Sequence, residues 1–395
     1  MSDSVQYETA GNQLADRTLI HLPTPGDHYS AKTGSAVSTL IYEYNRWHAA
    51  AGHQSEIIVG RNTMHDYTVG VCRLVDLVPQ PTKAQRALDV ALGRAGLRRR
   101  WTRAVSMPLV NAIPTDTTAA IVVHNQPVIL EDIRKRAPGS RIVLYCLNEL
   151  FAHYSDAEVR RVVQHADRII CVSQFTADCL NKRLAPNRRI AVGIVNGVDT
   201  VRFCPVATKG EPTEPTILFV ARIVPEKGAD LLLRAAQELV NRGRKFHIRI
   251  VGSSNFNAAD PLTQYEEELR GLAAPIQQMV TFVPFRDRES ILQEYRAAHI
   301  FCAPSNWDEP CSLTVPEAIA CGLPTVASRR GGIPEVGLDS VLYFDPPDVI
   351  GLADQLDHLL VDINHRRYLS SKARARAEEI RWENQYAKLY AEVFS

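Results

Sequence analysis

The sequence predicts an α/β protein made of two doubly wound domains, each with a parallel sheet covered by helices on both faces. Short continuous apolar runs alternate with longer amphipathic ones, which indicates buried strands joined by helices. This alternation restarts after a polar stretch, Pro205–Pro215, that is rich in Pro, Thr and charge. At 395 residues, the chain is also too long for one ordinary core.

The order of the apolar runs gives the expected elements of each domain. The N-terminal domain, residues 1–205, has expected strands at Thr18–His21, Glu56–Val59, Ala119–Val123, Arg141–Cys146, Arg168–Val172 and Ile190–Val195. The C-terminal domain, residues 206–378, has expected strands at Thr216–Ala221, Phe246–Val251, Val280–Val283, Ile300–Ala303 and Thr325–Ser328. Because ligands of open parallel sheets bind beyond the carboxyl ends of the strands, we expect the site in the cleft between the domains.

The composition sets few limits on partners. With 45 Lys and Arg against 44 Asp and Glu, the net charge of +1 argues neither for nor against nucleic acid. No apolar run reaches the length of a membrane span, and the N-terminus lacks the features of a signal peptide. We therefore expect a cytoplasmic protein. The eight cysteines include no Cys-x2-Cys pair, which favours reduced core residues over a zinc site.

Two carboxylates in the last quarter of the chain, Glu309 and Glu317, stand eight residues apart. The first lies in a Pro-interrupted loop, and between them Ser312, Leu313 and Thr314 predict the turn into a helix that carries the second. A helix start offers unpaired N–H groups and a positive dipole end, which suit a phosphate. Carboxylates beside it would accept hydrogen bonds from sugar hydroxyls. The pattern therefore predicts a nucleotide-sugar site.

Two cations, Arg222 and Lys227, follow the expected strand Ile217–Val220. A guanidinium and an ammonium can hold a departing nucleoside diphosphate without a metal ion. The sequence contains no Asp-x-Asp, the usual way in which a transferase presents a divalent ion. Taken alone, these cations are better explained as solvated loop residues. The two carboxylates downstream favour the phosphate clamp.

Together these segments resemble the retaining nucleotide-sugar glycosyltransferases of family 4, the glycosyl transferases group 1, which have the GT-B fold. The carboxylate pair is similar to the family's Glu-x7-Glu signature, and the run Phe219–Gly228 is similar to its Arg-x4-Lys clamp. Asn196–Asp199 followed by Phe203 is similar to its inter-domain segment. The likeness is good over residues 170–345 and loose in the N-terminal half.

The resemblance implies two Rossmann-like domains facing across a cleft, with a C-terminal helix in residues 379–395 that crosses back to the first domain. It also implies roles for individual residues. The implied catalytic residues are His124, Arg222, Lys227 and Glu309. The implied donor-binding residues are Gly34, Arg222, Lys227, Phe285, Glu309, Ser312, Leu313, Thr314 and Glu317. Within these sets, Glu317 holds ribose hydroxyls, Glu309 and His124 lie beside the transferred sugar, and Phe285 borders the base.

Two departures from the family pattern keep alternatives open. Cys311-Ser312 stands where an aromatic residue or Pro and then Gly are common, and Leu147 stands where relatives often carry a second histidine. Asn148 or Glu149 would substitute for that histidine. These departures favour a non-catalytic sugar-nucleotide-binding scaffold as one alternative. A sugar-nucleotide epimerase is the other.

The function expected from the resemblance is transfer of a hexose-type sugar, with retention, from a nucleotide diphosphate to a hydroxyl of a glycan or glycolipid. UDP or GDP is the expected nucleotide, and no metal ion or other cofactor is expected. Such a reaction would serve the synthesis of a surface polysaccharide or glycolipid.

A basic segment, residues 83–105, bears on partners. Seven cations (Lys83, Arg86, Arg94, Arg98, Arg99, Arg100 and Arg103) accompany the single acid Asp89. Leu88, Ala91, Leu92 and Ala95 recur at helical spacing. The pattern suits an anionic membrane surface, on the inner face of the cell membrane, as well as a solvated helix face. Aromatic residues do not alternate with the cations, so nucleic acid is not expected.

Overall fold

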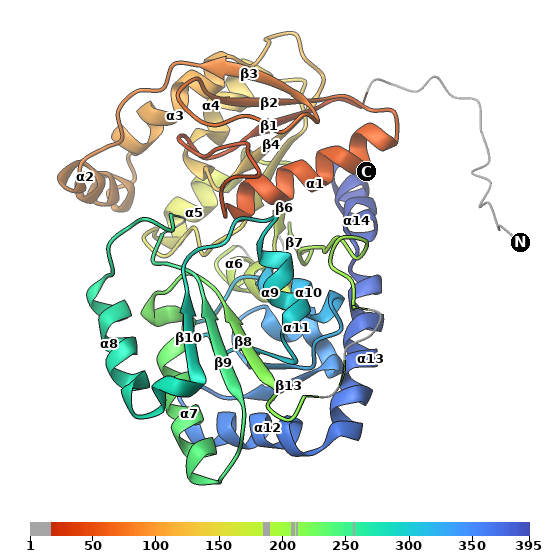
Figure 1. Cartoon of the computed structure of the whole chain (residues 1–395). Helices are drawn as coiled ribbons and strands as arrows, with labels where there is room; N and C mark the ends of the chain where they lie inside the picture. The colour runs from red at the N-terminus through yellow and green to blue at the C-terminus, as the bar shows by residue number, and fades with distance from the viewer. Residues whose placement is uncertain (1–16, 185–189, 207–209, 211, 256) are drawn as a thin grey trace, which may run out of the picture.

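The computed structural model describes residues 17–184, 190–206, 210, 212–255 and 257–395. Within these residues, two parallel sheets form the centres of two domains, one above the other in Figure 1. The N-terminal sheet has the order β3-β2-β1-β4-β5-β6-β7, and the C-terminal sheet has the order β10-β9-β8-β11-β12-β13. All paired strands are parallel, and helices cover the sheets, which confirms the predicted doubly wound α/β class.

The described elements of the N-terminal domain are β1 (Leu19–Leu22), α1 (Ala36–Ala50), β2 (Ser55–Gly60), β3 (Val71–Val75), α2 (Lys83–Arg94), α3 (Trp101–Asn111), β4 (Ala120–His124), α4 (Leu130–Arg136), β5 (Ile142–Cys146), α5 (Asp156–Val163), β6 (Arg168–Cys171), α6 (Gln174–Asn181) and β7 (Ala191–Gly193), with a 3₁₀ turn at Pro127–Ile129. Those of the C-terminal domain are β8 (Thr216–Val220), α7 (Ala229–Asn241), β9 (His247–Val251), α8 (Gln264–Ala273), β10 (Val280–Val283), α9 (Ile291–Ala297), β11 (Ile300–Ala303), α10 (Thr314–Ala320), β12 (Thr325–Ser328), α11 (Ile333–Gly337), β13 (Val341–Phe344), α12 (Val349–Val361), α13 (Ile363–Glu379) and α14 (Trp382–Phe394), with 3₁₀ turns at Pro225–Lys227, Ala274–Met279 and Leu338–Ser340.

The central strands show why the apolar runs were informative. Every residue of β4, β5, β11 and β12 is buried, because helices cover both faces of each sheet. Two strands of the structure, β3 and β13, are missing from the prediction. β3 lies at the edge of its sheet and has no buried residue, so its sequence lacks a continuous apolar run. β13 lies at the other sheet's edge and is half-buried at its centre.

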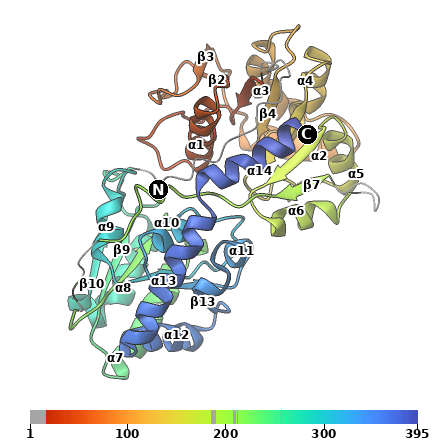
Figure 2. The ribbon, with the colours of Figure 1, turned by 90° about the vertical axis from the view of Figure 1, so that its right-hand side faces the viewer.

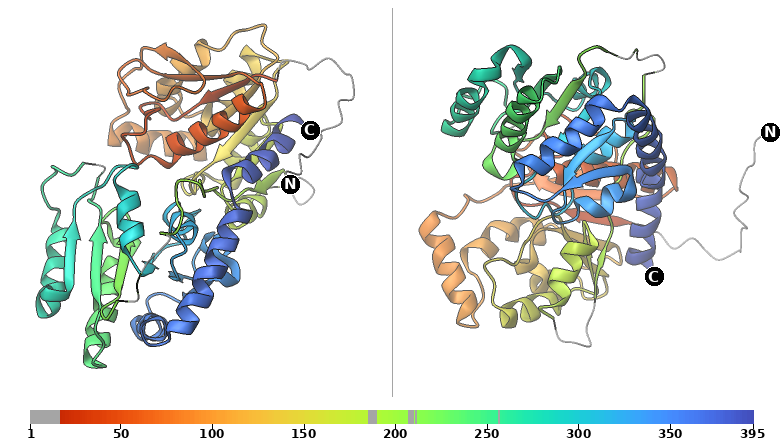
Figure 3. Two further views of the ribbon diagram at one scale, coloured as in Figure 1. Left: turned by 45° about the vertical axis from the view of Figure 1, so that its right-hand side comes forward. Right: turned by 90° about the horizontal axis from the view of Figure 1, so that it is seen from below.

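The C-terminal helix α14 packs on the N-terminal domain, although α13 before it belongs to the C-terminal domain. Figures 2 and 3 show the two helices running along one side of both domains. Trp382 packs edge-on against Tyr44 of α1, with ring centroids 5.6 Å apart. Tyr386 is hydrogen-bonded to His48 of α1, with 2.9 Å between the hydroxyl oxygen and Nδ1. The Nε atom of Arg168 in β6 lies 2.5 Å from Oε2 of Glu392. This helix therefore ties the two domains together.

Some parts of the sequence predictions lie outside the described residues. Residues 207–209 and 211 of the polar seam are among them, as are residues 1–16, on which the absence of a signal peptide was judged. In the described part of the chain, no helix combines the length and apolar character that a bilayer crossing requires.

Candidate active site

A cavity of about 740 Å³ opens between the two domains. Its C-terminal wall consists of segments that follow the carboxyl ends of β8, β9, β10 and β11, together with the start of α10. Its N-terminal wall includes the loop between β1 and α1 and the segment after β5. The cavity therefore lies where doubly wound folds place their ligands.

The segment after β8 brings Arg222 and Lys227 to the cavity wall. Lys227 ends a 3₁₀ turn, and Gly228 follows it with φ of +72°. A Cβ atom at Gly228 would lie only 2.0 Å from the carbonyl oxygen of Pro304, so the backbone approach requires glycine. Arg222 is exposed and forms no ion pair with any described residue, which leaves its guanidinium available to an anion.

Glu309 is buried in the loop after β11 and gathers three donors at one oxygen. The Lys227 ammonium pairs with Oε2 of Glu309. The indole Nε1 of Trp307 donates to the same oxygen at 3.0 Å, and the hydroxyl of Ser305 lies 3.4 Å from it. These contacts fix one carboxylate oxygen within the protein. The ion pair also brings together Lys227 and Glu309, which the sequence analysis predicted to share one site.

A Gly-Gly pair after β12 supports the Glu309 loop from behind. The N–H of Gly332 donates to the carbonyl oxygen of Glu309 at 2.8 Å. A Cβ atom at Gly331 would lie 2.2 Å from that carbonyl oxygen, and one at Gly332 would lie 2.7 Å from Cβ of Ser173 in the N-terminal domain. The pair therefore fills the space between the Glu309 loop and the other domain.

Glu317, on α10, is buried with both carboxylate oxygens engaged. The hydroxyl of Tyr295 donates to Oε2 at 2.9 Å, and Nη2 of Arg288 lies 3.2 Å from Oε1. Burial raises the pKa of the Glu317 carboxyl, and the Arg288 guanidinium and the Tyr295 hydroxyl oppose that rise. Glu317 also lines the cavity, so its oxygens can accept hydrogen bonds from a bound hydroxyl compound.

The turn into α10 presents backbone donors to the cavity. The hydroxyl of Ser312 accepts the N–H of Val315 at 3.3 Å and lies 3.1 Å from the hydroxyl of Thr314. Ser312 thus satisfies one N–H group in the first turn of α10. The N–H groups of Leu313 and Thr314 make no hydrogen bond to another described residue, and both residues line the cavity. They match the predicted phosphate cradle in position.

The N-terminal wall is built around the start of α1. Gly34 and Ser35 line the cavity, and Ser35 caps the helix by accepting the N–H of Ser38 at 3.4 Å. Asp27 and His28 lie on the same wall, and Nδ1 of His28 accepts the N–H of Met64 at 2.9 Å. Gly34, which the resemblance implies to be a donor-binding residue, therefore lies beside the cavity.

His124 lies behind this wall and not on it. Its side chain is fully buried at the end of β4, and Nε2 lies 3.0 Å from Nδ1 of His21. The ring also stacks on Tyr145 with centroids 5.6 Å apart. Burial and His21 lower the pKa of His124 well below its usual value, so the imidazole is neutral at physiological pH. A contact of His124 with the sugar stays a prediction.

Of the predicted residues, the cavity brings together Gly34, Arg222, Lys227, Phe285, Glu309, Ser312, Leu313, Thr314 and Glu317. Sequence reasoning missed Arg288, Tyr295 and Trp307, which hold the two carboxylates. Trp307 could have been found, since it stands two positions before Glu309. Among the described residues, no group of three or more His, Cys, Asp or Glu side chains is placed to hold a metal ion.

Comparison with known proteins shows what the C-terminal domain resembles. Residues 206–376 match the family described as glycosyl transferases group 1. Residues 206–376 are therefore similar to the glycosyl transferases group 1. The match covers the domain that contributes Arg222, Lys227, Glu309 and Glu317 to the cavity.

Curated relatives align with part of the chain. Spore coat protein SA of Bacillus subtilis is 28% identical over 274 residues, which are 65% of this chain and 72% of that protein. D-inositol 3-phosphate glycosyltransferase of Nocardia farcinica is 32% identical over 237 residues. Those residues make up 56% of this chain and 51% of the relative, so the chain spans about half the length of that enzyme.

A solved structure aligns with nearly the whole chain. The Anabaena protein HepE in complex with UDP-glucose has a TM-score of 0.69, with 95% of this chain and 99% of that chain covered at 17% identity. This likeness extends over both domains and shows the fold. The chain thus has the GT-B fold, with two Rossmann-like domains facing across a cleft.

Proposed function

We propose that the protein is a retaining glycosyltransferase that moves a hexose-type sugar from a nucleotide diphosphate to a hydroxyl group. The observation that carries the proposal is the shared cavity of two cations, Arg222 and Lys227, and two buried carboxylates, Glu309 and Glu317. The similarity of residues 206–376 to the glycosyl transferases group 1 supports transfer of a sugar. A GT-B neighbour in complex with UDP-glucose supports a nucleotide-sugar donor.

Different residues of the cavity would bind different parts of the donor. Ionised Glu317 would accept hydrogen bonds from the ribose, and the Leu313 and Thr314 N–H groups would hold phosphate oxygens at the positive end of α10. Arg222 and Lys227 would stabilise the charge that grows on the departing diphosphate. These groups supply the counter-charge themselves, so we propose that transfer needs no metal ion or other cofactor, with UDP or GDP as the nucleotide.

The stereochemistry follows from a front-face substitution. The acceptor oxygen forms a bond to the anomeric carbon on the face that the diphosphate leaves. The proton of the acceptor hydroxyl passes to an oxygen of the leaving phosphate, so no protein base is required. Glu309 would bind hydroxyls of the transferred sugar and fix the anomeric carbon near the acceptor. His124, in its neutral form behind the cavity wall, would help to orient the donor and to stabilise the positive charge that develops at the anomeric carbon.

The N-terminal wall favours an uncharged acceptor group. Its cation Lys32 is paired with Asp66 at 2.9 Å, while Asp27 and His28 offer polar atoms suited to hydroxyls. Asn148 lines the same wall beside Leu147. We therefore propose a hydroxyl of a glycan or glycolipid as the acceptor, in the assembly of a surface polysaccharide or glycolipid.

Thermal unfolding with UDP, GDP and ADP in turn tests the donor site. A ligand at about 100 times its Kd should stabilise the native protein by about 2.7 kcal/mol. We expect a shift with one nucleotide in the wild type and its loss in Glu317→Ala. No shift with any of the three would contradict the proposal and favour a binding scaffold with a closed site.

Two other functions are consistent with parts of the cavity. The side chain of Ser312 at the turn into α10 leaves less room for a phosphate than the usual glycine, which favours a non-catalytic sugar-nucleotide scaffold. An epimerase would use the same donor pocket without an acceptor. A scaffold would bind the nucleotide and yield no product, whereas an epimerase would convert the sugar nucleotide in the absence of any acceptor.

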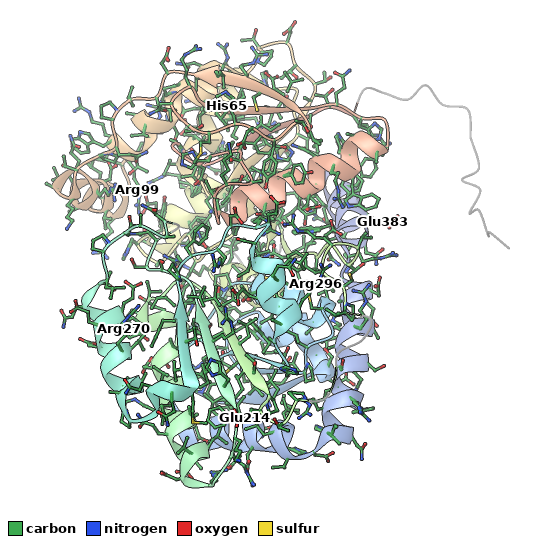
Figure 4. All side chains as sticks on the ribbon, viewed as in Figure 1. His65, Arg99, Glu214, Arg270, Arg296 and Glu383 are labelled. Carbon is green, nitrogen blue, oxygen red and sulfur yellow. The ribbon has the colours of Figure 1, made fainter. Side chains whose placement is uncertain are left out.

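We also propose that α2 contacts an anionic membrane surface, as a peripheral association of the N-terminal domain. Three of the seven cations of the basic segment are used internally: Arg98 and Arg103 pair with Asp132, and Arg99 (labelled in Figure 4) pairs with Glu158 and lies over the ring of Tyr154. The rest remains available. Lys83, Arg86 and Arg94 are exposed and form no ion pair with any described residue, and Leu88 is 52% exposed beside them.

Sedimentation with vesicles that contain phosphatidylserine tests this association. The wild type should bind at low salt and detach as salt rises, because charges beyond about 10 Å are screened at 0.1 M. Arg86→Glu with Arg94→Glu should abolish binding. A matched control, Arg234→Glu with Lys245→Glu, makes the same charge change at exposed residues of the other domain. Equal loss in both variants, or no binding by the wild type, would contradict the proposal.

A further inference from the structure

The N-terminus of α6, in the N-terminal domain, is capped by a residue from the other domain. The carboxylate of Glu335 on α11 accepts the N–H of Gln174 at 2.7 Å and the N–H of Phe175 at 2.6 Å. Ser173 accepts the next one, the N–H of Thr176, at 3.2 Å. The first three amides of α6 are therefore all satisfied, two of them across the domain boundary. Figure 2 shows α6 and α11 next to each other at this boundary.

The same segment of the C-terminal domain holds Glu309. Gly332 lies three residues before Glu335, donates its N–H to the carbonyl oxygen of Glu309 and packs against Ser173. Its neighbour Gly331 is so close to the Glu309 backbone that only glycine fits. A continuous series of contacts thus leads from the start of α6 through Glu335 and Gly332 to the backbone of Glu309.

The α11 segment is itself anchored on the opposite side. Arg376 of α13 donates to the carbonyl oxygens of Glu335, at 2.8 Å, and Val336, at 2.9 Å. The main chain of α11 is therefore fixed to its own domain, while the Glu335 side chain reaches the other one. Two charge-assisted hydrogen bonds and the dipole of α6 favour this contact.

We propose that Glu335 is a positioning residue that couples the arrangement of the two domains to the place of Glu309 in the cavity. This inference rests on the proposed function, in which Glu309 binds the transferred sugar. When Glu335 holds α6, Gly332 stays between Ser173 and the Glu309 loop. When the contact is absent, the loop loses the support that fixes its carbonyl oxygen, and the Glu309 carboxylate moves relative to the anomeric carbon.

The variant Glu335→Ala tests the inference in the full chain. Glu392→Ala is its matched control, because Glu392 of the crossing helix α14 also binds a residue of the N-terminal domain, Arg168, but has no link to Glu309. We expect Glu335→Ala to lower the transfer rate by about 10- to 100-fold, as a displacement near 1 Å can do. The affinity for the nucleoside diphosphate should change less than about threefold, since Glu309 is not assigned to the nucleotide. Glu392→Ala should change neither the transfer rate nor the affinity for the nucleoside diphosphate.

Hydrogen exchange gives a readout that does not depend on activity. Glu335→Ala should speed amide exchange in residues 173–176 and also in residues 305–312, whereas Glu392→Ala should leave both segments unchanged. Faster exchange in 173–176 alone would overturn the coupling, because Glu335 would then be only a cap. If the wild type binds a nucleotide but transfers no sugar, the proposed function fails while this readout still decides the coupling.

A conservative variant separates the hydrogen bonds from packing. Glu335→Gln keeps one acceptor oxygen, so it should recover part of the lost transfer rate and part of the slow exchange in residues 305–312. No recovery in either measurement would show that the two hydrogen bonds do not carry the coupling.

Discussion

Lys227 and Glu309, 82 positions apart in the chain, meet at the wall of the cavity through an ion pair between Nζ and Oε2. Both side chains are mostly buried, so each charge depends on the other for its partner. A bound diphosphate would give Lys227 a second anion, and a bound sugar would give Glu309 new donors. The donor would therefore enter a site in which the charges of Lys227 and Glu309 are already paired and held in place.

Replacing Lys227 by Ala should lower turnover much more than stability. Loss of a cation that stabilises the departing diphosphate should reduce kcat by about 100- to 1000-fold. The free energy of unfolding should fall by about 1–3 kcal/mol, because the Glu309 carboxylate loses one of its partners. Lys245→Ala, at an exposed lysine of the same domain, is the control. Steady-state kinetics and urea unfolding measure the two effects, and unchanged kcat would refute the phosphate clamp.

The pair of Arg288 and Glu317 makes a prediction about pH. Burial raises the pKa of the Glu317 carboxyl and the Arg288 guanidinium opposes that rise, so Arg288→Ala should raise the pKa further. Nucleotide binding that needs ionised Glu317 should then weaken as pH falls, more steeply than in the wild type. Calorimetric titration at pH 6 and pH 8 measures this. Arg286→Ala removes a cation of the same cavity wall that pairs with Glu294, and it should change affinity equally at both pH values.

Glu43 should make stability depend on pH near neutrality. Burial raises the pKa of its carboxyl to about 7, despite Arg46, whose Nη2 lies 3.5 Å from Oε2. The folded protein therefore binds this proton more tightly than the unfolded chain does, and stability is lost as pH rises from about 4.5 to 7. Glu43→Gln should remove that loss, which is on the order of 3 kcal/mol at most. Urea unfolding at pH 5 and pH 8 should show a smaller pH difference in the variant; an equal difference would contradict the assignment.

Two glycines with the same positive φ allow backbone strain to be separated from steric crowding. Gly228 and Gly243 both have φ of +72°, but a Cβ atom would meet the Pro304 carbonyl oxygen at 2.0 Å in the first and nothing within 4 Å in the second. Gly243→Ala should cost about 1 kcal/mol through backbone strain alone. Gly228→Ala should cost at least about 2 kcal/mol more and should also weaken nucleotide binding, because Lys227 precedes it. Thermal unfolding of both variants measures the difference, and equal losses would contradict the close approach at Pro304.

The sequence predicted the fold class because most of the strands are covered on both faces. A strand such as β5, buried throughout, must be apolar at every position, and that property is visible locally. The edge strand β3 lacks it and was missed. The main cavity residues were also predictable, since Arg222, Lys227, Glu309 and Glu317 each follow a strand end in a recognisable pattern.

Contacts between distant positions were beyond the reach of sequence patterns. Nothing near Glu317 in the chain indicates that Arg288 would bind it, and nothing near His124 indicates that His21 would contact its ring. The basic segment shows the same limit, because Arg99 finds its acid 59 positions away in Glu158. Such pairs depend on how the strands are ordered in the sheets, which local composition does not determine.

The most direct test of sugar transfer is chromatography of the products formed from labelled UDP- and GDP-sugars, with and without a hydroxyl acceptor such as an alkyl glycoside. The account predicts a labelled glycoside that forms only with the acceptor, keeps the anomeric configuration of the donor and is lost in Arg222→Ala with Lys227→Ala. Conversion of the sugar nucleotide without an acceptor would instead show an epimerase. Nucleotide binding with no product under either condition would contradict transfer and show a scaffold.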